Sequence, residues 1–431
     1  MPVRLDKSRA DFTERFATFL AMKREVSADI EAATRAIVED VATRGDAALI
    51  EATRKFDRLD LDAGGLRVTP AEIDAAVKGC DPATLKALEF ARDRIESFHR
   101  RQLPKDQHFT DALGVELGWR WSAIESVGLY VPGGTAAYPS SVLMNAVPAK
   151  VAGVARVAMV VPSPDGKLNP LVLAAAHLGG VSEIYRVGGA QAVAALAWGT
   201  ATIAPVAKIV GPGNAYVAAA KRLVFGKVGI DMIAGPSEVL VIADRTGNAG
   251  WIAADLLAQA EHDVNAQSIL ITDDIALADD VERAVEAQLV TLPRADIARA
   301  SWNEFGAVIL VKNLGESVAL ANAIAAEHLE IMTADPEALS AQIRNAGAIF
   351  LGAHTPEAIG DYVGGSNHVL PTARSARFSS GLGVLDFMKR TSILKCGPDQ
   401  LRALGPAAMT LGKAEGLDAH ARSVGLRLNL S

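Results

Sequence analysis

The stretch that decides the fold class runs from residue 157 to residue 224: VAMVVPSPDGKLNPLVLAAAHLGGVSEIYRVGGAQAVAALAWGTATIAPVAKIVGPGNAYVAAAKRLV. Short apolar runs of strand length alternate in it with alanine-rich segments of helical length. The pattern predicts strands at 157–161, 184–187 and 208–210, followed in turn by helices at 171–178, 190–197 and 215–223. Strands that alternate with helices in this way predict a parallel sheet with helices on both faces.

The same alternation resumes towards the C-terminus, after a break near residues 231–238. It predicts strands at 239–243, 268–272, 308–311 and 348–351, with helices at 251–261 and 277–288 between them. One sheet would have to hold too many strands, so we expect two separate α/β units. The fold class is therefore predicted as α/β with two parallel-sheet domains.

The segments outside these units have other patterns. The first hundred residues predict helices, because Thr69-Pro70-Ala71-Glu72 has the sequence of a capping box and Asp81-Pro82 caps an amphipathic stretch. The charge-free run 126–149 contains several prolines and is interpreted as a strand followed by a ligand loop. After Gly381 the strand signal fades, and 398–428 predicts short helices with a final strand. So small a tail has little core of its own, and we expect it to pack on another surface, such as a partner subunit.

Composition and charge exclude several classes of protein. The chain of 431 residues has a formal net charge of −7 and no cluster of lysine and arginine, so no nucleic-acid partner is expected. Helix breakers interrupt its long apolar runs, and the N-terminus is charged early, so neither a membrane span nor a signal peptide is expected. Two distant cysteines, Cys80 and Cys396, form neither a disulfide framework nor a thiolate zinc site, and they predict a reducing, cytoplasmic location.

Two polar pairs interrupt the apolar framework. Gln259 and His262 are three residues apart at the end of a predicted helix, so both point to one face, where an amide oxygen and an imidazole nitrogen can bind one metal ion. A surface or capping role is the commoner use of such a pair. Glu327 and His328 supply two proton-transfer groups with different pKa values, although a solvated helix end is again the commoner explanation.

Two further polar segments lie nearer the C-terminus. In the segment 360–368, glycines on both sides of polar residues predict a tight loop, in which Asp361 could ligate a metal and His368 could reach a substrate. The segment 415–420 in the tail has the pattern of an ordinary polar turn. Two imidazole nitrogens and two oxygens suit zinc, with manganese and cobalt as substitutes, and they would come from Gln259, His262, Asp361 and His420.

Three glycine-rich segments follow predicted strands, at 128–134, 188–191 and 210–216. The last of them opens a helix, which is a favourable place for a phosphate. It is not the G-x-G-x-x-G fingerprint, because Tyr216 stands where the third glycine belongs. Since ligands of open α/β sheets bind at the carboxyl ends of the strands, three such loops in one unit favour a bound nucleotide.

These segments together resemble the histidinol dehydrogenase family over nearly the whole chain. One departure is Ala326, where many members have proline before the Glu-His pair; the position carries no functional group. The segments that carry the resemblance are 130–134 (YVPGG), 188–192 (GGAQA), 210–214 (VGPGN), 234–238 (AGPSE), 259–262 (QAEH), 327–330 (EHLE), 360–362 (GDY), 367–372 (NHVLPT) and 415–417 (EGL).

The resemblance implies a site with one zinc ion per subunit and NAD as hydride acceptor. It implies zinc ligands at Gln259, His262, Asp361 and His420, of which His420 comes, with Glu415, from the second subunit of a domain-swapped homodimer. It implies NAD contacts at Tyr130, Gln191 and Asn214. It implies substrate contacts at Ser237, His328, His368 and Glu415, besides the zinc ligands.

The activity that the resemblance implies is the four-electron oxidation of L-histidinol to L-histidine with two NAD⁺ in sequence. His328 is expected to act as the base in both oxidations, and Glu327 to activate water on the bound L-histidinaldehyde. Zinc is expected to hold the substrate's imidazole and amino nitrogens, mainly as an orienting template.

The expected domain division combines the resemblance with the sequence pattern. Both α/β domains are expected to be Rossmann-like, with a helical N-terminal segment and a small C-terminal tail domain. The expected parts are 1–26 with 382–394 as a small dimerisation domain, 27–129 with 237–381 as a first α/β domain carrying the metal and catalytic residues, 130–236 as an NAD-binding domain, and 395–431 as a tail domain that reaches the partner.

Three alternatives remain open at this point. A paralogue on the same scaffold could oxidise another polar alcohol, such as a sulfonated diol, but Ser237, His368, Glu415 and His420 together favour histidinol. A zinc hydrolase, with Glu327 activating water, would leave the three glycine-rich loops without a purpose. A non-catalytic metal-binding or scaffold protein would bind zinc without turnover.

Overall fold

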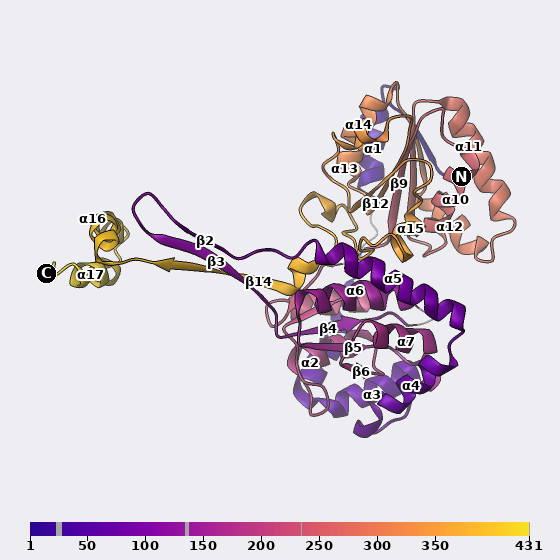
Figure 1. The fold of residues 1–431 in the computed structure, drawn as a ribbon. Coiled ribbons are helices and arrows are strands. Elements are labelled where there is room, and N and C mark those ends of the chain that lie inside the picture. Colours follow the sequence, from indigo (N-terminus) through magenta and orange to yellow (C-terminus); the bar gives the residue numbers. More distant parts are fainter. Residues whose placement is uncertain (23–27, 134–137, 234, 431) are drawn as a thin grey trace.

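The computed structural model describes residues 1–22, 28–133, 138–233 and 235–430. Two α/β domains lie one against the other, and a long arm extends from them to the C-terminal helices (Figure 1). The two parallel sheets confirm the α/β fold class and the two predicted units. Within the described residues, no helix combines the length and apolar character needed to cross a membrane.

Sheet A is six-stranded and parallel, and it forms the centre of the first domain. Helices α10 (Ala249–Ala260), α11 (Ile275–Leu289) and α12 (Ala295–Phe305) cover one face, and α1 (Phe12–Leu20), α13 (Ser317–Ile324) and α14 (Pro336–Ser340) cover the other. The short helix α15 (Glu357–Tyr362) follows the last strand. The strand order is β1 (Val3–Asp6), β11 (Ala307–Leu310), β10 (Gln267–Thr272), β9 (Glu238–Ala243), β12 (His328–Met332) and β13 (Ala348–Leu351).

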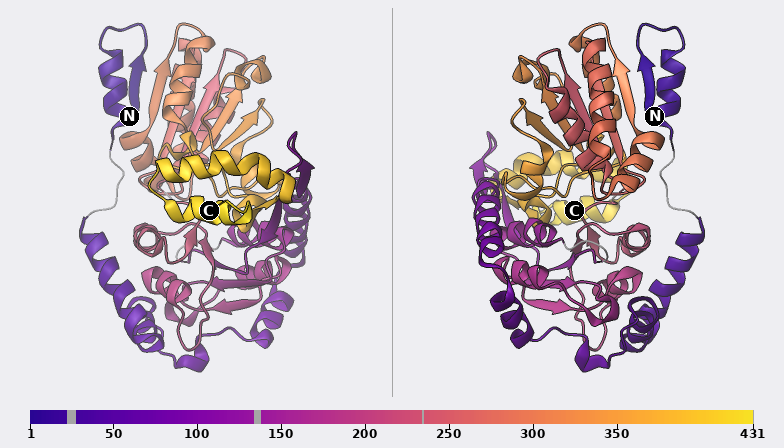
Figure 2. Two further views of the ribbon diagram at one scale, coloured as in Figure 1. Left: turned by 90° about the vertical axis from the view of Figure 1, so that its left-hand side faces the viewer. Right: turned by 90° about the vertical axis from the view of Figure 1, so that its right-hand side faces the viewer.

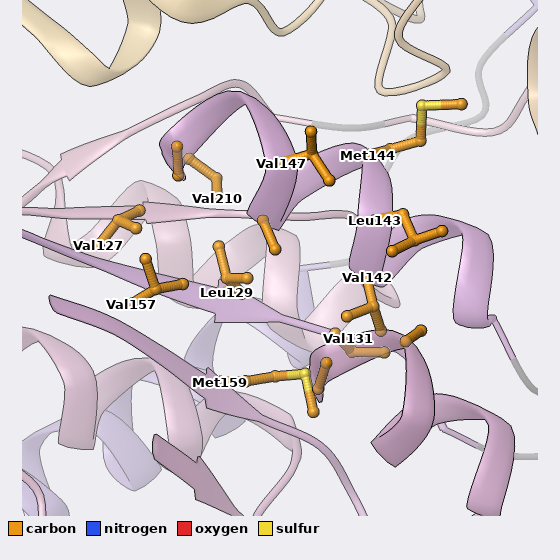
Figure 3. Close-up of a cluster of buried hydrophobic side chains, with 14 of the residues drawn as sticks. Val127, Leu129, Val131, Val142, Leu143, Met144, Val147, Val157, Met159 and Val210 are labelled. Carbon is orange, nitrogen blue, oxygen red and sulfur yellow. The ribbon is translucent and has the colours of Figure 1, made fainter. Parts of the chain in front are cut away.

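Sheet B is five-stranded and parallel, and it forms the centre of the second domain. Its strand order is β6 (Glu183–Tyr185), β5 (Arg156–Val160), β4 (Ser126–Tyr130), β7 (Lys208–Val210) and β8 (Gly229–Ile230). One face is covered by α4 (Pro70–Gly79), α5 (Pro82–Arg100), α6 (Pro139–Ala152) and α7 (Pro170–Leu178), and the other by α2 (Ala28–Arg44), α3 (Asp46–Asp57), α8 (Gly189–Trp198) and α9 (Ala215–Val224). Figure 3 shows part of the core between β4, β5 and α6.

The two sheets share one topology. Counted from the first strand of each repeat, β4 to β8 and β9 to β13 both lie in the order 3-2-1-4-5, with β1 added at the edge of sheet A. This is the Rossmann strand order 3-2-1-4-5-6 without its sixth strand, and it has a switch point between the first and fourth strands. The switch points lie between β4 and β7 in sheet B and between β9 and β12 in sheet A.

The arm is a three-stranded antiparallel sheet with a helical pair at its tip. Its central strand, β3 (Glu116–Ala123), pairs with β2 (Gln107–Thr110) and with β14 (Met388–Lys395), which lies far away in the sequence. Beyond β14, helices α16 (Pro398–Ala414) and α17 (Asp418–Arg427) pack against each other, well away from both domains (Figure 1). Short 3₁₀ turns complete the chain at 63–65, 164–166, 314–316, 375–377 and 384–387.

The structure corrects the expected grouping of segments into domains. The helices of 28–100 pack on sheet B and not with residues 237–381, because the apolar stripes of α2, α3 and α5 cover that sheet. Residues 1–22 and 382–394 form no common domain, since β1 pairs in sheet A and β14 pairs in the arm. Figure 2 shows the first helix on the upper domain and the next helices of the chain on the lower one.

Two local predictions are also wrong. The ligand loop expected within 126–149 is partly the buried helix α6, which accommodates Pro148 in its interior. The tail has no final strand among its described residues; its strand, β14, lies before the helices and is exposed along most of its length. The commoner alternative for residues 327 and 328, a solvated helix end, is excluded, because α13 ends at Ile324, Ala325 follows in the left-handed conformation and His328 begins the buried strand β12.

Other predictions of local structure are confirmed. The predicted strands and helices of 157–224 and of 239–351 all appear within a few residues of their expected limits. Thr69 and Glu72 form the predicted capping box at the start of α4, and Asp81 caps α5 by accepting from the Thr84 N–H. Of the glycine-rich motifs, Gly134 and Ala234 lie outside the described residues.

Candidate active site

The candidate site lies at the amino ends of the strands of sheet A, which we call its amino edge, at the switch point between β9 and β12. Strands β9 and β12 begin side by side there, with His328 opposite Val239 in register. The C-terminal ends of α10 and α15 reach the same edge and bring Gln259 and Asp361 to it. Figure 1 shows this edge turned towards the domain of sheet B. Glu327 and His328, the predicted proton-transfer pair, are both buried here.

His328 is held by a backbone carbonyl and surrounded by carboxylates. Its Nδ1 lies 3.1 Å from the carbonyl oxygen of Glu238. Because a carbonyl only accepts hydrogen bonds, Nδ1 keeps its proton and Nε2 is the nitrogen that takes up or releases one. That Nε2 is buried without a hydrogen bond and lies 3.6 Å from Asp361 Oδ1. Burial opposes the charged ring, but Glu327, Glu357 and Asp361 raise the pKa of His328 well above its usual value.

Glu327 is placed as a second proton-transfer group. Its Oε2 accepts the backbone N–H of Glu238 at 3.0 Å and lies 3.8 Å from His328 Nδ1. Burial raises the pKa of Glu327 to about 7, against the opposing effect of His328. A carboxyl group with this pKa can exchange a proton at neutral pH in either direction.

Two buried carboxyl groups behind His328 were not predicted as site residues. Glu357 Oε2 lies 3.7 Å from His328 Nδ1, and the Glu357 N–H donates to Glu330 Oε1 at 2.7 Å. Burial raises the pKa of Glu357 to about 8 and that of Glu330 to about 9, the latter also through Asp255. The sequence signal that could have found them is a lone acid among apolar residues, as Glu330 is in the strand HLEIM.

Gln259 is a buried amide without a partner among the described residues. The residue is 1% exposed, and neither Nε2 nor Oε1 makes a hydrogen bond. Buried polar groups are nearly always satisfied, so this amide is available for a ligand. Asp361 lies on the neighbouring α15; burial opposes its charge, but His328, His368 and His262 around it lower its pKa. Both side chains lie at or near helix C-terminal ends, where the helix dipole favours a cation.

One chain does not complete the expected metal site. Among the residues that the structure describes, no group of three or more His, Cys, Asp and Glu side chains is arranged to hold a metal ion. His262 follows α10 in an exposed turn, whereas His420 is on α17 at the tip of the arm, together with Glu415 at the end of α16. The structure therefore brings Gln259 and Asp361 together with the predicted catalytic pair and leaves Glu415 and His420 far away in the same chain (Figure 1).

His368 connects the two domains beside this site. Its Nδ1 donates to the carbonyl oxygen of Asp361 at 3.0 Å, and its Nε2 lies 3.3 Å from Ser141 Oγ on α6. Burial lowers the pKa of His368, so the ring is neutral. Ser237, the last residue before β9, is half-buried at the same edge of sheet A, and its carbonyl oxygen accepts from the Gln267 N–H.

The three predicted nucleotide contacts lie at the carboxyl edge of sheet B. Tyr130 ends β4, and its buried hydroxyl accepts the Gly189 N–H at 3.0 Å; burial raises its pKa to about 12. Gln191 is buried in the first turn of α8. Asn214 caps α9 by accepting from the N–H groups of Tyr216 and Val217, and it is itself exposed. These residues surround the switch point, where a dinucleotide binds in folds of this topology.

Comparison with known proteins gives one family along the whole chain. The family model described as histidinol dehydrogenase matches residues 20–428. Two curated proteins named histidinol dehydrogenase are 84% identical over 431 residues (Bradyrhizobium diazoefficiens) and 86% identical over 429 residues (Nitrobacter winogradskyi), each covering 100% of both chains. A solved structure of histidinol dehydrogenase from Elizabethkingia anophelis matches with a TM-score of 0.94 at 36% identity, covering 99% of this chain and 98% of that one.

Proposed function

This chain belongs to the histidinol dehydrogenase family, and from that membership and the geometry of the site we propose that it oxidises L-histidinol to L-histidine, the closing reaction of histidine biosynthesis. The observation that carries the proposal is the arrangement of His328 and Glu327 at one edge of sheet A. An imidazole held through Nδ1 and a carboxyl group with a pKa of about 7 share one buried corner, beside the Gln259 amide, which has no partner among the described residues.

His328 is the proposed base of both oxidation steps. The Glu238 carbonyl fixes its tautomer, so Nε2 is the atom that takes the substrate's hydroxyl proton. NAD⁺, when bound, supplies the acceptor for the two hydrides that a four-electron oxidation releases. Tyr130, Gln191 and Asn214 would hold it at the carboxyl edge of sheet B.

Glu327 is the proposed base for the hydration of the aldehyde. Its ionised form would take a proton from water as the oxygen bonds to the carbonyl carbon of L-histidinaldehyde. Return of that proton to the former carbonyl oxygen gives the gem-diol that the second oxidation converts to the acid. The hydrogen bond from the Glu238 N–H keeps Oε2 in place through both protonation states. Ser237, His368 and Glu415 are the proposed further contacts of the substrate.

One zinc ion per subunit is proposed at Gln259, His262, Asp361 and His420 of the partner subunit. The residues of this chain fit the group, because the Gln259 amide is buried without a partner among the described residues and Asp361 brings a carboxylate close to it near the end of α15. Zinc would supply an orienting template for the nitrogen atoms of histidinol.

A domain-swapped homodimer is proposed because the arm and its tip are poorly covered in one chain. Strand β14 is exposed along its length, and so are several apolar side chains of the arm and tip: Phe109, Ile393, Leu394, Leu411, Leu417 and Leu426. Apolar surface of this kind marks an interface, and a second copy of the chain is the partner that would also receive His420 and Glu415 at its site. A cytoplasmic location is proposed on the two free cysteines alone.

The test is the number of NADH molecules formed per L-histidinol at limiting histidinol, with zinc-loaded protein and a chelated control. Two NADH per histidinol, lost on chelation, support the four-electron, zinc-dependent reaction. One NADH would mean that the aldehyde leaves the enzyme. Turnover that chelation does not change would overturn the proposed role of zinc, and no turnover would direct attention to other polar alcohols.

A further inference from the structure

A buried ion pair lies beneath the turn that follows β7, residues 211–214, which we call the Gly211 turn. Lys221 on α9 pairs with Asp231, the residue after β8, and their side chains are only 3% and 1% exposed. Two charges lose their hydration on burial, and their attraction often fails to compensate for that loss. A pair this deeply buried therefore invites an explanation beyond stability.

Both partners hold the backbone of the same glycine. The Gly211 N–H donates to Asp231 Oδ2 at 2.8 Å, and Lys221 Nζ donates to the Gly211 carbonyl oxygen at 3.0 Å. Gly211 has a φ of +109°, and a Cβ at this position would lie 2.2 Å from the carbonyl oxygen of Tyr130. The ion pair thus fixes a backbone conformation that favours glycine. In this conformation the turn lies too close to the end of β4 for a side chain at position 211.

The turn stands between two of the proposed nucleotide contacts. Tyr130 lies against Gly211 on one side, and Asn214 ends the turn on the other. Asp231 also accepts the Met232 N–H at 2.6 Å, at the start of the connection to β9. That connection ends at Glu238, whose N–H donates to Glu327, so the ion pair joins the turn to the segment that reaches the catalytic edge.

We propose that Lys221 and Asp231 are positioning residues for the dinucleotide: together they hold the Gly211 turn in its binding conformation and so set the affinity for NAD. The proposal rests on the NAD dependence proposed above. Neither side chain touches the reacting atoms, because both are enclosed between α9, β7 and β8, so the rate of chemistry at saturating nucleotide does not depend on them directly.

The decisive variant is Lys221→Met, which keeps an unbranched side chain and removes the donor to the Gly211 carbonyl. We expect the KM for NAD⁺ and the Kd for NADH to rise about tenfold, as loss of one charge-assisted hydrogen bond implies. The KM for histidinol, and kcat at saturating NAD⁺, should stay within about twofold. A second variant, Lys221→Met with Asp231→Asn, removes the unpaired carboxylate yet leaves an acceptor for the Gly211 N–H. It should recover Tm towards the wild type while the Kd for NADH stays raised.

The matched control is Arg156→Met, at the opposite edge of the same sheet. Arg156 pairs with Glu183 at 2.7 Å and donates to the carbonyl oxygen of Pro205, so its loss also breaks an ion pair that holds a loop. We expect a lower Tm and an unchanged Kd for NADH. If the Kd follows Tm in all variants, or if Lys221→Met binds NADH as the wild type does, the positioning role is refuted while the NAD-dependent function stands. A wild type that binds no NADH would refute both.

Discussion

Replacing Glu327 by glutamine should separate the two oxidation steps. Glutamine has the shape of the glutamate and keeps an acceptor for the Glu238 N–H, which now bonds Glu327 at 3.0 Å, so the local structure is preserved. The variant loses only the group that is proposed to deprotonate water. We therefore expect oxidation of L-histidinaldehyde to fall by about 10²- to 10⁴-fold, the usual contribution of a positioned base, and oxidation of L-histidinol to the aldehyde to fall by less than about tenfold.

The pH dependence of aldehyde oxidation provides a second test of the role of Glu327. With a pKa of about 7, Glu327 is half ionised at pH 7. Below that pH, the wild-type rate of aldehyde oxidation should fall about tenfold per unit, because the carboxylate takes up a proton and can no longer act as a base. Glu327→Gln has no such group, so its residual aldehyde oxidation should lose this limb of the profile.

The assay is single-turnover NADH formation, with L-histidinol and with L-histidinaldehyde as separate substrates. The wild type should form two NADH per site from histidinol, whereas Glu327→Gln should form one rapidly and then stall. Glu337→Gln, which changes an exposed carboxylate on α14, is the matched control and should behave as the wild type. Equal losses in the two half-reactions would refute the assignment of Glu327 to the hydration step.

Three further predictions follow from the same geometry. Gln259→Leu removes an amide that has no partner among the described residues, so it should raise the free energy of unfolding of the metal-free protein by about 1–3 kcal/mol in urea titrations. It should also weaken zinc binding at least tenfold in equilibrium dialysis. Unfolded Glu327→Gln and His420→Asn chains should restore about a quarter of wild-type activity when they are mixed and refolded together. Half of the dimers would be hybrids, and each hybrid would have one intact site of its two. No recovery of activity would contradict the swapped dimer. Burial raises the pKa of Glu330 to about 9, so the folded state keeps a proton that the unfolded state loses above pH ~4.5. The free energy of unfolding therefore falls as pH rises between these two values. Glu330→Gln should be more stable than the wild type by about 3 kcal/mol at pH 7, and the difference should vanish near pH 4.

The sequence predicts the central sheets well because their signals are local. Each strand of 157–224 is a short apolar run bounded by glycine or proline, and each is buried on both faces in the structure. The pattern cannot say which sheet the helices of 28–100 cover, because an apolar stripe on α2 or α5 fits either sheet equally well. That choice is made by tertiary contacts, which leave no separate mark in the sequence.

The arm was missed for a different physical reason. Strand β14 is exposed on nearly every residue, so its sequence MKRTSILK shows no alternation between buried and exposed positions. Its partner, β3, lies more than 260 positions earlier, from Glu116 to Ala123, and a pairing at that distance has no local signature. The sequence does indicate that the tail has too few apolar residues for a core of its own. It therefore predicts that the tail packs on another surface, such as a partner subunit.

For the candidate site, the sequence predicts residue types but not their environment. For Glu327 and His328, a helix end in solvent is the commoner explanation of the local sequence alone, whereas the chain turns at Ala325 and buries both at the start of β12. Burial is what raises the pKa of Glu327 towards neutrality, so the chemistry of the pair depends on a feature that periodicity did not predict. Glu357 and Glu330 were missed for the same reason, since only their burial makes them notable.

The candidate site lies between the amino edge of sheet A and the carboxyl edge of sheet B. Ligands of open parallel sheets bind at the carboxyl edge, and the proposed nucleotide site at Tyr130 and the Gly211 turn of sheet B follows this rule. Sheet A has the same strand order, yet it presents His328 and Glu238 from the amino ends of β12 and β9. Because these two edges are of opposite kinds, the helix ends that lie at them carry opposite partial charges. Helices α10 and α15 end at the amino edge of sheet A, so their negative dipole ends favour a cation, while α8 and α9 begin at the carboxyl edge of sheet B, so their positive ends favour phosphates. Two copies of one topology, opposed in this way, supply the different electrostatic environments that the proposed metal-bound substrate and the proposed dinucleotide require.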